Sequence, residues 1–183
     1  MALKSTIFKA ELQIADIDRD YYHEHALTLA RHPSETDERL MVRMLVFALN
    51  ASESLSFGRG LSTEDEPDLW QKDLTGSIEL WIDVGLPDEK AMRKACGRAR
   101  QVKIYSYGGR AAALWWGQTR DKIMRADNLA VIELPAEATR AMAALAQRNM
   151  RLRCTIQDGL VWLDSGQGTT QVEPVMRKAP HAL

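Results

Sequence analysis

The stretch from Pro67 to Gly85, PDLWQKDLTGSIELWIDVG, predicts a β-hairpin that carries an acidic residue at the same end of each strand. If Thr75-Gly76 form a two-residue turn, residues that face each other have numbers that sum to 151. Strand side chains alternate between the two faces, so the facing pairs on one side are Lys72–Glu79, Trp70–Trp81 and Asp68–Asp83. The hairpin therefore places two carboxylates side by side.

The other side of the second strand is an apolar row, which predicts that this side covers a core: Ile78, Leu80, Ile82 and Val84. The side with the acids is then the candidate functional face. Like charges directly opposite each other destabilise a sheet. An Asp68–Asp83 pair therefore calls for a bound metal, a raised pKa or a solvated strand end, and the sequence leaves these three explanations open.

Length and composition describe an ordinary globular protein. The 183 residues are enough for one domain, 1–183, with a substantial core. Hydrophobic residues make up 45% of the chain and charged residues 27%. The net charge of −1 argues against a protein whose main task is to coat nucleic acid, but a nucleic acid could still bind locally.

The two cysteines and the N-terminus bear on the compartment. Cys96 and Cys154 lack C-x-x-C spacing, which argues against a zinc site or a disulfide framework and indicates a reducing environment. The first residues, MALKSTIFKAELQIAD, lack a signal-peptide pattern, and the sequence has no apolar stretch of membrane-spanning length. We expect a cytoplasmic protein without a membrane anchor, whose protein partners and oligomeric state are open.

Around the central hairpin, the periodicity predicts alternating strands and helices. The expected strands are 8–14, 21–30, 101–107 and 129–134, and the expected helices are 34–52, one beginning after Pro87, 110–125 and 136–148. Ser34 and Asp37 resemble a capping box for the first helix. Asp158-Gly159 predicts another hairpin, with facing residues whose numbers sum to 317, and an edge strand follows in the tail. The expected fold is α/β, with a mixed central sheet flanked by helices and extended by the terminal hairpins.

The hairpin also resembles a known enzyme core. Pro67-Asp68 opening one strand and Asp83-Val84-Gly85 ending the next are similar to the motif of the PD-(D/E)xK nuclease superfamily, except that Gly85 stands where the lysine would be. Over nearly the full length, the chain resembles the YaeQ family, a variant of that superfamily. The segments that carry this resemblance are FGRGLSTEDEPDLW, IELWIDVGLPDEKAMRKACGRA and VKIYSYG, in this order.

The resemblance implies a nuclease-like core and a site that holds Mg²⁺ or Mn²⁺. Asp68 and Asp83 would be catalytic residues and metal ligands, and Glu38, on the preceding helix, or Glu79 would supply a third oxygen. A first-turn acid favoured by the helix dipole is the simpler explanation for Glu38. In place of the missing lysine we expect Lys94, rather than Lys72, Lys90 or Lys103.

Two classes of function remain open. The first is a magnesium-dependent nuclease-like enzyme that hydrolyses phosphodiesters, which the resemblance implies and the paired acids allow. The second is a non-enzymatic interaction protein on the same scaffold, associated with transcription or nucleic-acid metabolism. The absence of a lysine at position 85 favours the second class, and the facing acids favour the first. The sequence does not identify a substrate.

Overall fold

The computed structural model describes residues 4–63 and 65–181, which form eleven strands and four α-helices within that part of the chain. The first sheet, sheet A, has the order β10-β9-β8-β1-β2. Its strands are β1 (Thr6–Asp16), β2 (Tyr21–Arg31), β8 (Asn149–Gln157), β9 (Leu160–Asp164) and β10 (Thr169–Val172). β1 and β8 run parallel at its centre, and the other pairs are antiparallel, so sheet A is mixed.

The second sheet, sheet B, contains the central hairpin and has the order β11-β7-β6-β5-β4-β3. Its strands are β3 (Leu55–Phe57), β4 (Leu69–Lys72), β5 (Ile78–Val84), β6 (Ala99–Ser106), β7 (Leu129–Glu133) and β11 (Val175–Lys178). β5, β6 and β7 are parallel, as expected for strands joined by helical crossovers. The strands at the two sides of sheet B pair antiparallel.

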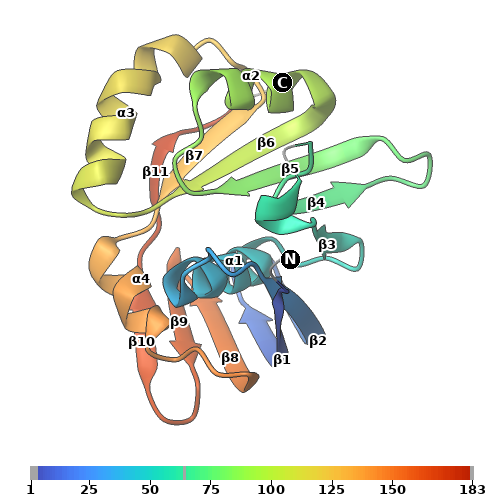
Figure 1. Cartoon of the computed structure of the whole chain (residues 1–183), viewed down its shortest axis with the longest axis vertical. Helices are drawn as coiled ribbons and strands as arrows, with labels where there is room; N and C mark the ends of the chain where they lie inside the picture. The colour runs from blue at the N-terminus through green and yellow to red at the C-terminus, as the bar shows by residue number, and fades with distance from the viewer. Residues whose placement is uncertain (1–3, 64, 182–183) are drawn as a thin grey trace.

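The helices separate and cover the sheets. They are α1 (Asp37–Asn50), α2 (Glu89–Arg98), α3 (Arg110–Ile123) and α4 (Ala136–Ala143), and a short 3-10 helix, η1 (Gly60–Ser62), precedes β4. Figure 1 shows α1 between the two sheets, with α4 beside it and with α2 and α3 on the far side of sheet B. The molecule therefore has four layers, and one face of sheet A is left open.

The buried side chains form two cores, one on each face of sheet B. The larger core lies around α1, where Leu12, Leu45 and Ile82 from three different layers are each 0% exposed. The smaller core fills the space between sheet B and the helices α2 and α3. Both faces of β5 are covered, which explains why all its residues except Glu79 and Asp83 are apolar.

The terminal hairpins do not extend the central sheet, so that expectation was wrong. The β1–β2 and β8–β9 hairpins join each other through the parallel β1–β8 pairing and build sheet A. The alternating apolar residues of these hairpins need a layer to pack against. Helix α1 is that layer, and it packs against sheet B as well. The coarser expectation, a mixed α/β protein with helices on both faces of the hairpin sheet, is confirmed.

Two local expectations had different outcomes. The Asp158-Gly159 turn is confirmed: both residues have positive φ, and the facing pairs include Cys154–Leu163 and Ile156–Val161. The capping box at Ser34 was wrong, because α1 begins later. Its N-cap is Thr36, whose side chain accepts a hydrogen bond from the amide of Arg39. Within the described residues, no helix combines the length and apolar character needed to cross a membrane.

Candidate functional site

The hairpin register places the two acids as expected near its open end. Leu69 pairs with Ile82 and Trp70 pairs with Trp81, so the next position in the same register brings Asp68 beside Asp83. The other end of the hairpin differs from the expectation. Lys72 faces Ile78 instead of Glu79, because residues 73–77 form a longer loop and the register shifts. That loop is held by Asp73, whose carboxylate accepts hydrogen bonds from the amides of Thr75 and Ser77.

The expectation of one buried face and one open functional face was wrong in part. Ile82 and Val84 are buried against α1, while Ile78 and Leu80 are only half-buried. On the opposite face Trp81 is 4% exposed, because α2 and α3 cover it. The acids therefore lie at a strand end that opens between layers, not on a broad open surface.

Asp68 is buried and fully hydrogen-bonded. Only 6% of its surface is exposed. Its Oδ1 accepts a hydrogen bond from Arg39 Nη2 at 2.7 Å, and its Oδ2 accepts one from the amide of Val84 at 2.8 Å. An ionised carboxylate with a guanidinium and a backbone N–H on its two oxygens is satisfied without a metal.

Arg39 comes from the first turns of α1 and reaches across to the hairpin end. Its Nη2 also lies 3.5 Å from the carbonyl oxygen of Val84, and its Nη1 lies 3.8 Å from Oε1 of Glu35. Nη1 is buried and has no hydrogen-bond partner among the described residues. Arg39 was missed in the sequence. The available signal was its spacing of four residues from Glu35, which lies just before the N-cap of α1.

Glu35 extends the charged cluster inward. It binds Arg43, with Arg43 Nε at 2.8 Å from one carboxylate oxygen and Nη2 at 3.0 Å from the other, and both side chains are buried. Arg43 also donates to the carbonyl oxygen of Ala30 in β2. The cluster thus ties the layer of α1 to both sheets, and each buried charge has an opposite charge beside it.

Asp83 has a different environment. Its Oδ2 accepts a hydrogen bond from Trp81 Nε1 at 2.8 Å. Burial raises the pKa of the Asp83 carboxyl to about 6, and the negative charge of Asp68 adds to this rise, while the hydrogen bond from Trp81 opposes it. Of the three explanations for the facing acids, a raised pKa applies to Asp83, while Asp68 has a cationic partner, Arg39, which none of the three anticipated.

Tyr107, which follows β6, belongs to the same strand-end cluster and was also missed in the sequence. Burial raises the pKa of its hydroxyl, Arg39 lowers it, and Glu38, Glu35 and Asp68 raise it further. These influences place an aromatic hydroxyl among the charged groups at the carboxyl ends of β5 and β6. In α/β sheets this edge is where ligands commonly bind.

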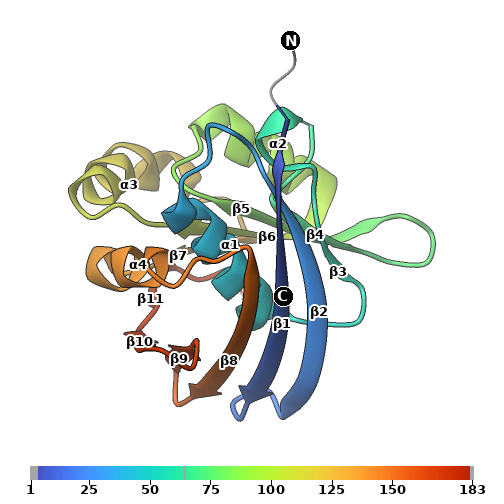
Figure 2. The ribbon, with the colours of Figure 1, turned by 60° about the horizontal axis from the view of Figure 1, so that its bottom comes forward.

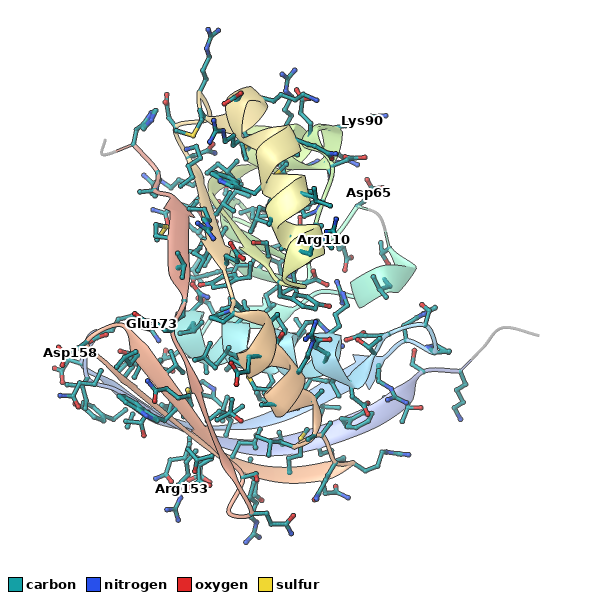
Figure 3. All side chains as sticks on the ribbon, turned by 90° about the vertical axis from the view of Figure 1, so that its left-hand side faces the viewer. Asp65, Lys90, Arg110, Arg153, Asp158 and Glu173 are labelled. Atoms are coloured by element: carbon teal, nitrogen blue, oxygen red, sulfur yellow. The ribbon has the colours of Figure 1, made fainter. Side chains whose placement is uncertain are left out.

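The other predicted site residues have partners elsewhere. Glu38 Oε1 accepts a hydrogen bond from Thr139 Oγ1 of α4 at 2.7 Å, and Glu79 pairs with Arg100 at 3.3 Å. Lys94 pairs with Asp65, which Figure 3 labels in the loop before β4. Lys94 is therefore engaged by a surface acid, and the cation that the structure brings to the acid pair is Arg39.

The residues present do not fit a divalent cation in this arrangement. In the described part of the chain, no group of three or more His, Cys, Asp or Glu side chains could hold a metal ion. Both oxygens of Asp68 are already hydrogen-bonded, and one of those donors is itself a cation. A metal at this place would compete with Arg39 for the same carboxylate.

The backbone at Gly85, the position of the missing lysine, has an unusual conformation. Gly85 has φ of +112°, a conformation that side-chain-bearing residues rarely adopt. Its amide donates a hydrogen bond to the carbonyl oxygen of Tyr105, which holds this turn against β6. A lysine at this position would be strained, so the glycine is part of the local structure.

Known proteins resemble the chain over nearly its whole length. The family model described as YaeQ protein matches residues 1–174. The uncharacterized protein YaeQ of Escherichia coli K12 is 45% identical over 172 residues, which cover 94% of this chain and 95% of that protein. Its counterpart in Salmonella typhi is 45% identical over 173 residues, 94% of this chain and 96% of that protein.

Two solved structures have the same fold. The crystal structure of YaeQ from Xanthomonas axonopodis pv. citri superposes with a TM-score of 0.94 at 54% identity, covering 96% of this chain and 99% of that one. The structure of YaeQ from Pseudomonas syringae gives a TM-score of 0.92 at 33% identity, covering 97% and 98%. With the family model and the identities in agreement, the chain belongs to the YaeQ family.

Proposed function

We propose that the protein is a non-hydrolytic interaction protein on a scaffold of the PD-(D/E)xK nuclease type, and that it binds nucleic acid locally in the context of transcription or nucleic-acid metabolism. The order of α1, the β4–β5 hairpin, α2 and β6 agrees with that scaffold. The register of the hairpin brings Asp68 and Asp83 beside each other at its open end, which supports the proposal.

The observation that carries the non-hydrolytic part is the pairing of Asp68 with Arg39. A hydrolase of this type needs Asp68 to coordinate a metal, whereas here Arg39 and the amide of Val84 take both carboxylate oxygens. The positive φ of Gly85 would strain a lysine at this position, and Lys94 is paired with Asp65. Asp83 therefore lacks the lysine that would orient an attacking water.

A hollow near the turn end of the β4–β5 hairpin supports nucleic-acid binding. It measures about 630 Å³, and its lining includes Trp70, Trp81, Arg98 and Arg100 together with the acids Asp65, Asp73 and Glu79. The Arg98 and Arg100 side chains are 44% and 72% exposed, so their guanidinium groups are accessible. The half-buried Trp70 ring can stack on a base and guanidinium groups can bind phosphates, which is the usual combination in single-strand binding surfaces, whereas Trp81 is buried.

The acid pair is tested by metal titration. We expect no heat and no change in melting temperature when Mg²⁺, Mn²⁺ or chelator is added, because Arg39 already neutralises Asp68. A bound ion at about 100 times its dissociation constant would instead stabilise the fold by roughly 2.7 kcal/mol. A metal-dependent rise in melting temperature that disappears in Asp83→Asn would overturn the non-hydrolytic proposal.

The hollow is tested with fluorescent single-stranded DNA and RNA by anisotropy. We expect Arg98→Glu/Arg100→Glu to weaken binding and to reduce the salt slope, by about 0.7 for each lost phosphate contact on a single strand. The matched control is Arg151→Glu/Arg153→Glu, which makes the same charge change on sheet A, where Figure 3 shows Arg153 pointing away from the molecule. Equal losses in both variants would indicate unspecific charge attraction and contradict a site in the hollow.

Metal-dependent phosphodiester hydrolysis is the second candidate, because the cluster holds more carboxylates than cations. Glu35, Glu38 and Asp68 lie near Arg39 and Arg43, and the pKa of Asp83 is raised mainly by burial, with the negative charge of Asp68 adding to the rise. Cleavage of labelled nucleic acid in Mn²⁺, lost in both Asp68→Asn and Asp83→Asn and in chelator, would establish this candidate over the first.

A further inference from the structure

β2 differs from every other edge strand that the structure describes. It runs over eleven residues, Tyr21–Arg31, and only β1 pairs with it. The remaining edge strands, β3, β10 and β11, are three, four and four residues long. In Figures 1 and 2, β2 lies on the outer side of sheet A. A long outer strand presents a row of backbone donors and acceptors to other chains.

Proline, lysine and β-bulges, three features that commonly prevent edge pairing, are missing from β2, although it carries the charged residues Glu24 and Arg31. Its sequence, YYHEHALTLAR, contains no proline, glycine or lysine, and its register with β1 is continuous from end to end. Within the described residues, its backbone makes no hydrogen bond to any backbone segment other than β1, and the side chain of Arg43 is what reaches one of its carbonyl groups, that of Ala30. The edge is therefore regular and available along most of its length.

We propose that β2 is a homodimer interface, in which a second copy adds its own β2 antiparallel across a twofold axis. This inference does not depend on the proposed function. A twofold axis perpendicular to the sheet keeps the open face of one copy continuous with the open face of the other. Facing residues must then lie on the same face, so their numbers sum to an even value.

One register fits the side chains best, the one in which facing numbers sum to 52. On the open face it gives the pairs Tyr22–Ala30, Glu24–Thr28 and Ala26–Ala26, and on the inner face His23–Leu29 and His25–Leu27. Tyr22 faces the small Ala30, the Glu24 carboxylate can accept a hydrogen bond from the hydroxyl of Thr28, and no like charges meet. The neighbouring even registers, 50 and 54, would bring His25 against His25 or His23 against Arg31.

The axis at Ala26 makes the proposal testable by cross-linking. Only the residue on a twofold axis faces itself, and facing Cα atoms in an antiparallel pair lie about 4.5–5.5 Å apart, within the range for a disulfide. Ala26 is exposed, and of the native thiols Cys154 is buried and Cys96 half-buried. Under mild oxidation we expect Ala26→Cys to form a covalent dimer of twice the 20.6 kDa chain mass.

The control is Gln171→Cys, which places an exposed thiol on β10, the opposite edge of sheet A. Under the same oxidation, we expect neither this variant nor the unmodified protein to form a covalent dimer on a non-reducing gel. Ala26→Cys cross-linking no faster than Gln171→Cys would overturn the proposed interface, and the edge would then be available to a different chain.

A charge pair tests the register without a covalent bond. Thr28→Glu places a carboxylate opposite Lys9 within the chain but opposite Glu24 of the second copy. The monomer fold is thereby supported while two symmetric repulsive contacts oppose the dimer. We expect the dissociation constant, measured by sedimentation velocity, to rise roughly 2- to 30-fold.

Thr28→Lys reverses the charge at the interface, because its ammonium group would face Glu24 of the second copy, although within the chain it would face Lys9. We expect the dissociation constant of Thr28→Lys to fall, relative to the unmodified protein, by at least the factor by which Thr28→Glu raises it. Gln171→Glu, which adds the same charge at the far edge, should leave the dissociation constant unchanged. A monomeric unmodified protein at all concentrations, or equal weakening by both substitutions at Thr28, would contradict the proposal.

Discussion

The two acids at the end of the β4–β5 hairpin lie on neighbouring strands but have different surroundings. Asp68 is 6% exposed and has a guanidinium on one oxygen and a backbone amide on the other. Asp83 is half-buried, and Trp81, a neutral donor, is its hydrogen-bonding side-chain partner. One carboxylate is bound by a cation and an amide, and the other has a pKa raised to about 6.

The difference follows from which layer each acid meets. Asp68 lies within reach of α1, which supplies Arg39 from its first turns. Asp83 shares its face with Trp81, which the apolar core under α2 and α3 covers. A single cation can neutralise one of two facing carboxylates, and the other then reduces their repulsion by holding a proton more readily. Substitutions at five positions can break or sharpen this contrast.

The largest expected effect is that of Arg39→Met. The substitution leaves the buried Asp68 carboxylate without its cation, and the loss of one partner from a buried ion pair typically costs about 3–5 kcal/mol. Urea unfolding at pH 7 measures the change. The control is Arg93→Met, which removes an exposed pair with Glu89, has a side chain that is 71% exposed, and should cost less than about 1 kcal/mol.

A second variant separates charge from packing. Arg39→Met/Asp68→Asn carries no unpaired charge at this point, so part of the lost stability should return. If the single Arg39 substitution costs no more than the Arg93 control, the pairing of Asp68 with Arg39 is not a stabilising interaction and the contrast between the two acids is smaller than the geometry indicates.

The next effect is that of Asp83→Asn, and it depends on pH. The folded protein binds the Asp83 proton more tightly than the unfolded chain does, because its pKa is raised from 3.8 to about 6. The resulting stabilisation is complete below pH 3.8 and is lost as the pH rises through about 6. At pH 8 the charged group is therefore unfavourable, and its removal should stabilise the protein by up to about 3 kcal/mol, at 1.36 kcal/mol per pKa unit.

Asp68→Asn is the matched comparison and should have the opposite sign. It removes a charge that Arg39 stabilises, so we expect a loss of roughly 1.5–3 kcal/mol at pH 8, the range for hydrogen bonds to charged groups. Unfolding curves at pH 4 and pH 8 measure both variants. Stabilisation by both substitutions at pH 8 would mean that the two acids are equivalent.

The third effect concerns the turn after Asp83. Gly85→Ala adds a Cβ that meets nothing within 4 Å, so its cost comes from the backbone alone, at φ of +112°. We expect a loss of roughly 1–3 kcal/mol. Gly97→Ala is the control within α2, also without atoms near the added Cβ, and should stabilise by about 0.5–1 kcal/mol as glycine does not favour helices. A neutral Gly85→Ala would remove the strain argument against a lysine there.

Local patterns in the sequence predicted the elements and the main pairings. The register that joins Trp70 to Trp81 is confirmed, as is the β8–β9 hairpin. These features depend on alternation and turn residues close together in the chain. The two-sheet arrangement could not be predicted in the same way, because the β1–β8 pairing joins segments about 140 residues apart, for which no local signal exists.

The candidate site shows the same limit. The positions of Asp68 and Asp83 followed from hairpin arithmetic, but the partners of Asp68 and Lys94 did not. Arg39 reaches Asp68 across 29 positions, and Lys94 reaches Asp65 across the same separation. A charged side chain on a helix can pair with any acid that tertiary packing brings near it, so residue type and spacing alone did not choose between Lys94 and Arg39.

The smallest expected effect is that of Trp81→Phe, which isolates the hydrogen bond to Asp83. Trp81 Nε1 donates to the Asp83 carboxylate, and this donation favours the ionised form. Without it the pKa of Asp83 should rise above its present value of about 6. Because Trp81 is 4% exposed, the substitution also costs packing energy at every pH. The contribution of the hydrogen bond is therefore the difference between the cost at pH 8 and the cost at pH 4, which we expect to be about 1 kcal/mol.

In an Asp83→Asn background the packing cost should remain and the pH-dependent difference should vanish. A difference that persists in that background would assign the pH dependence to another group, and Asp83 would lose its place as the titrating member of the pair.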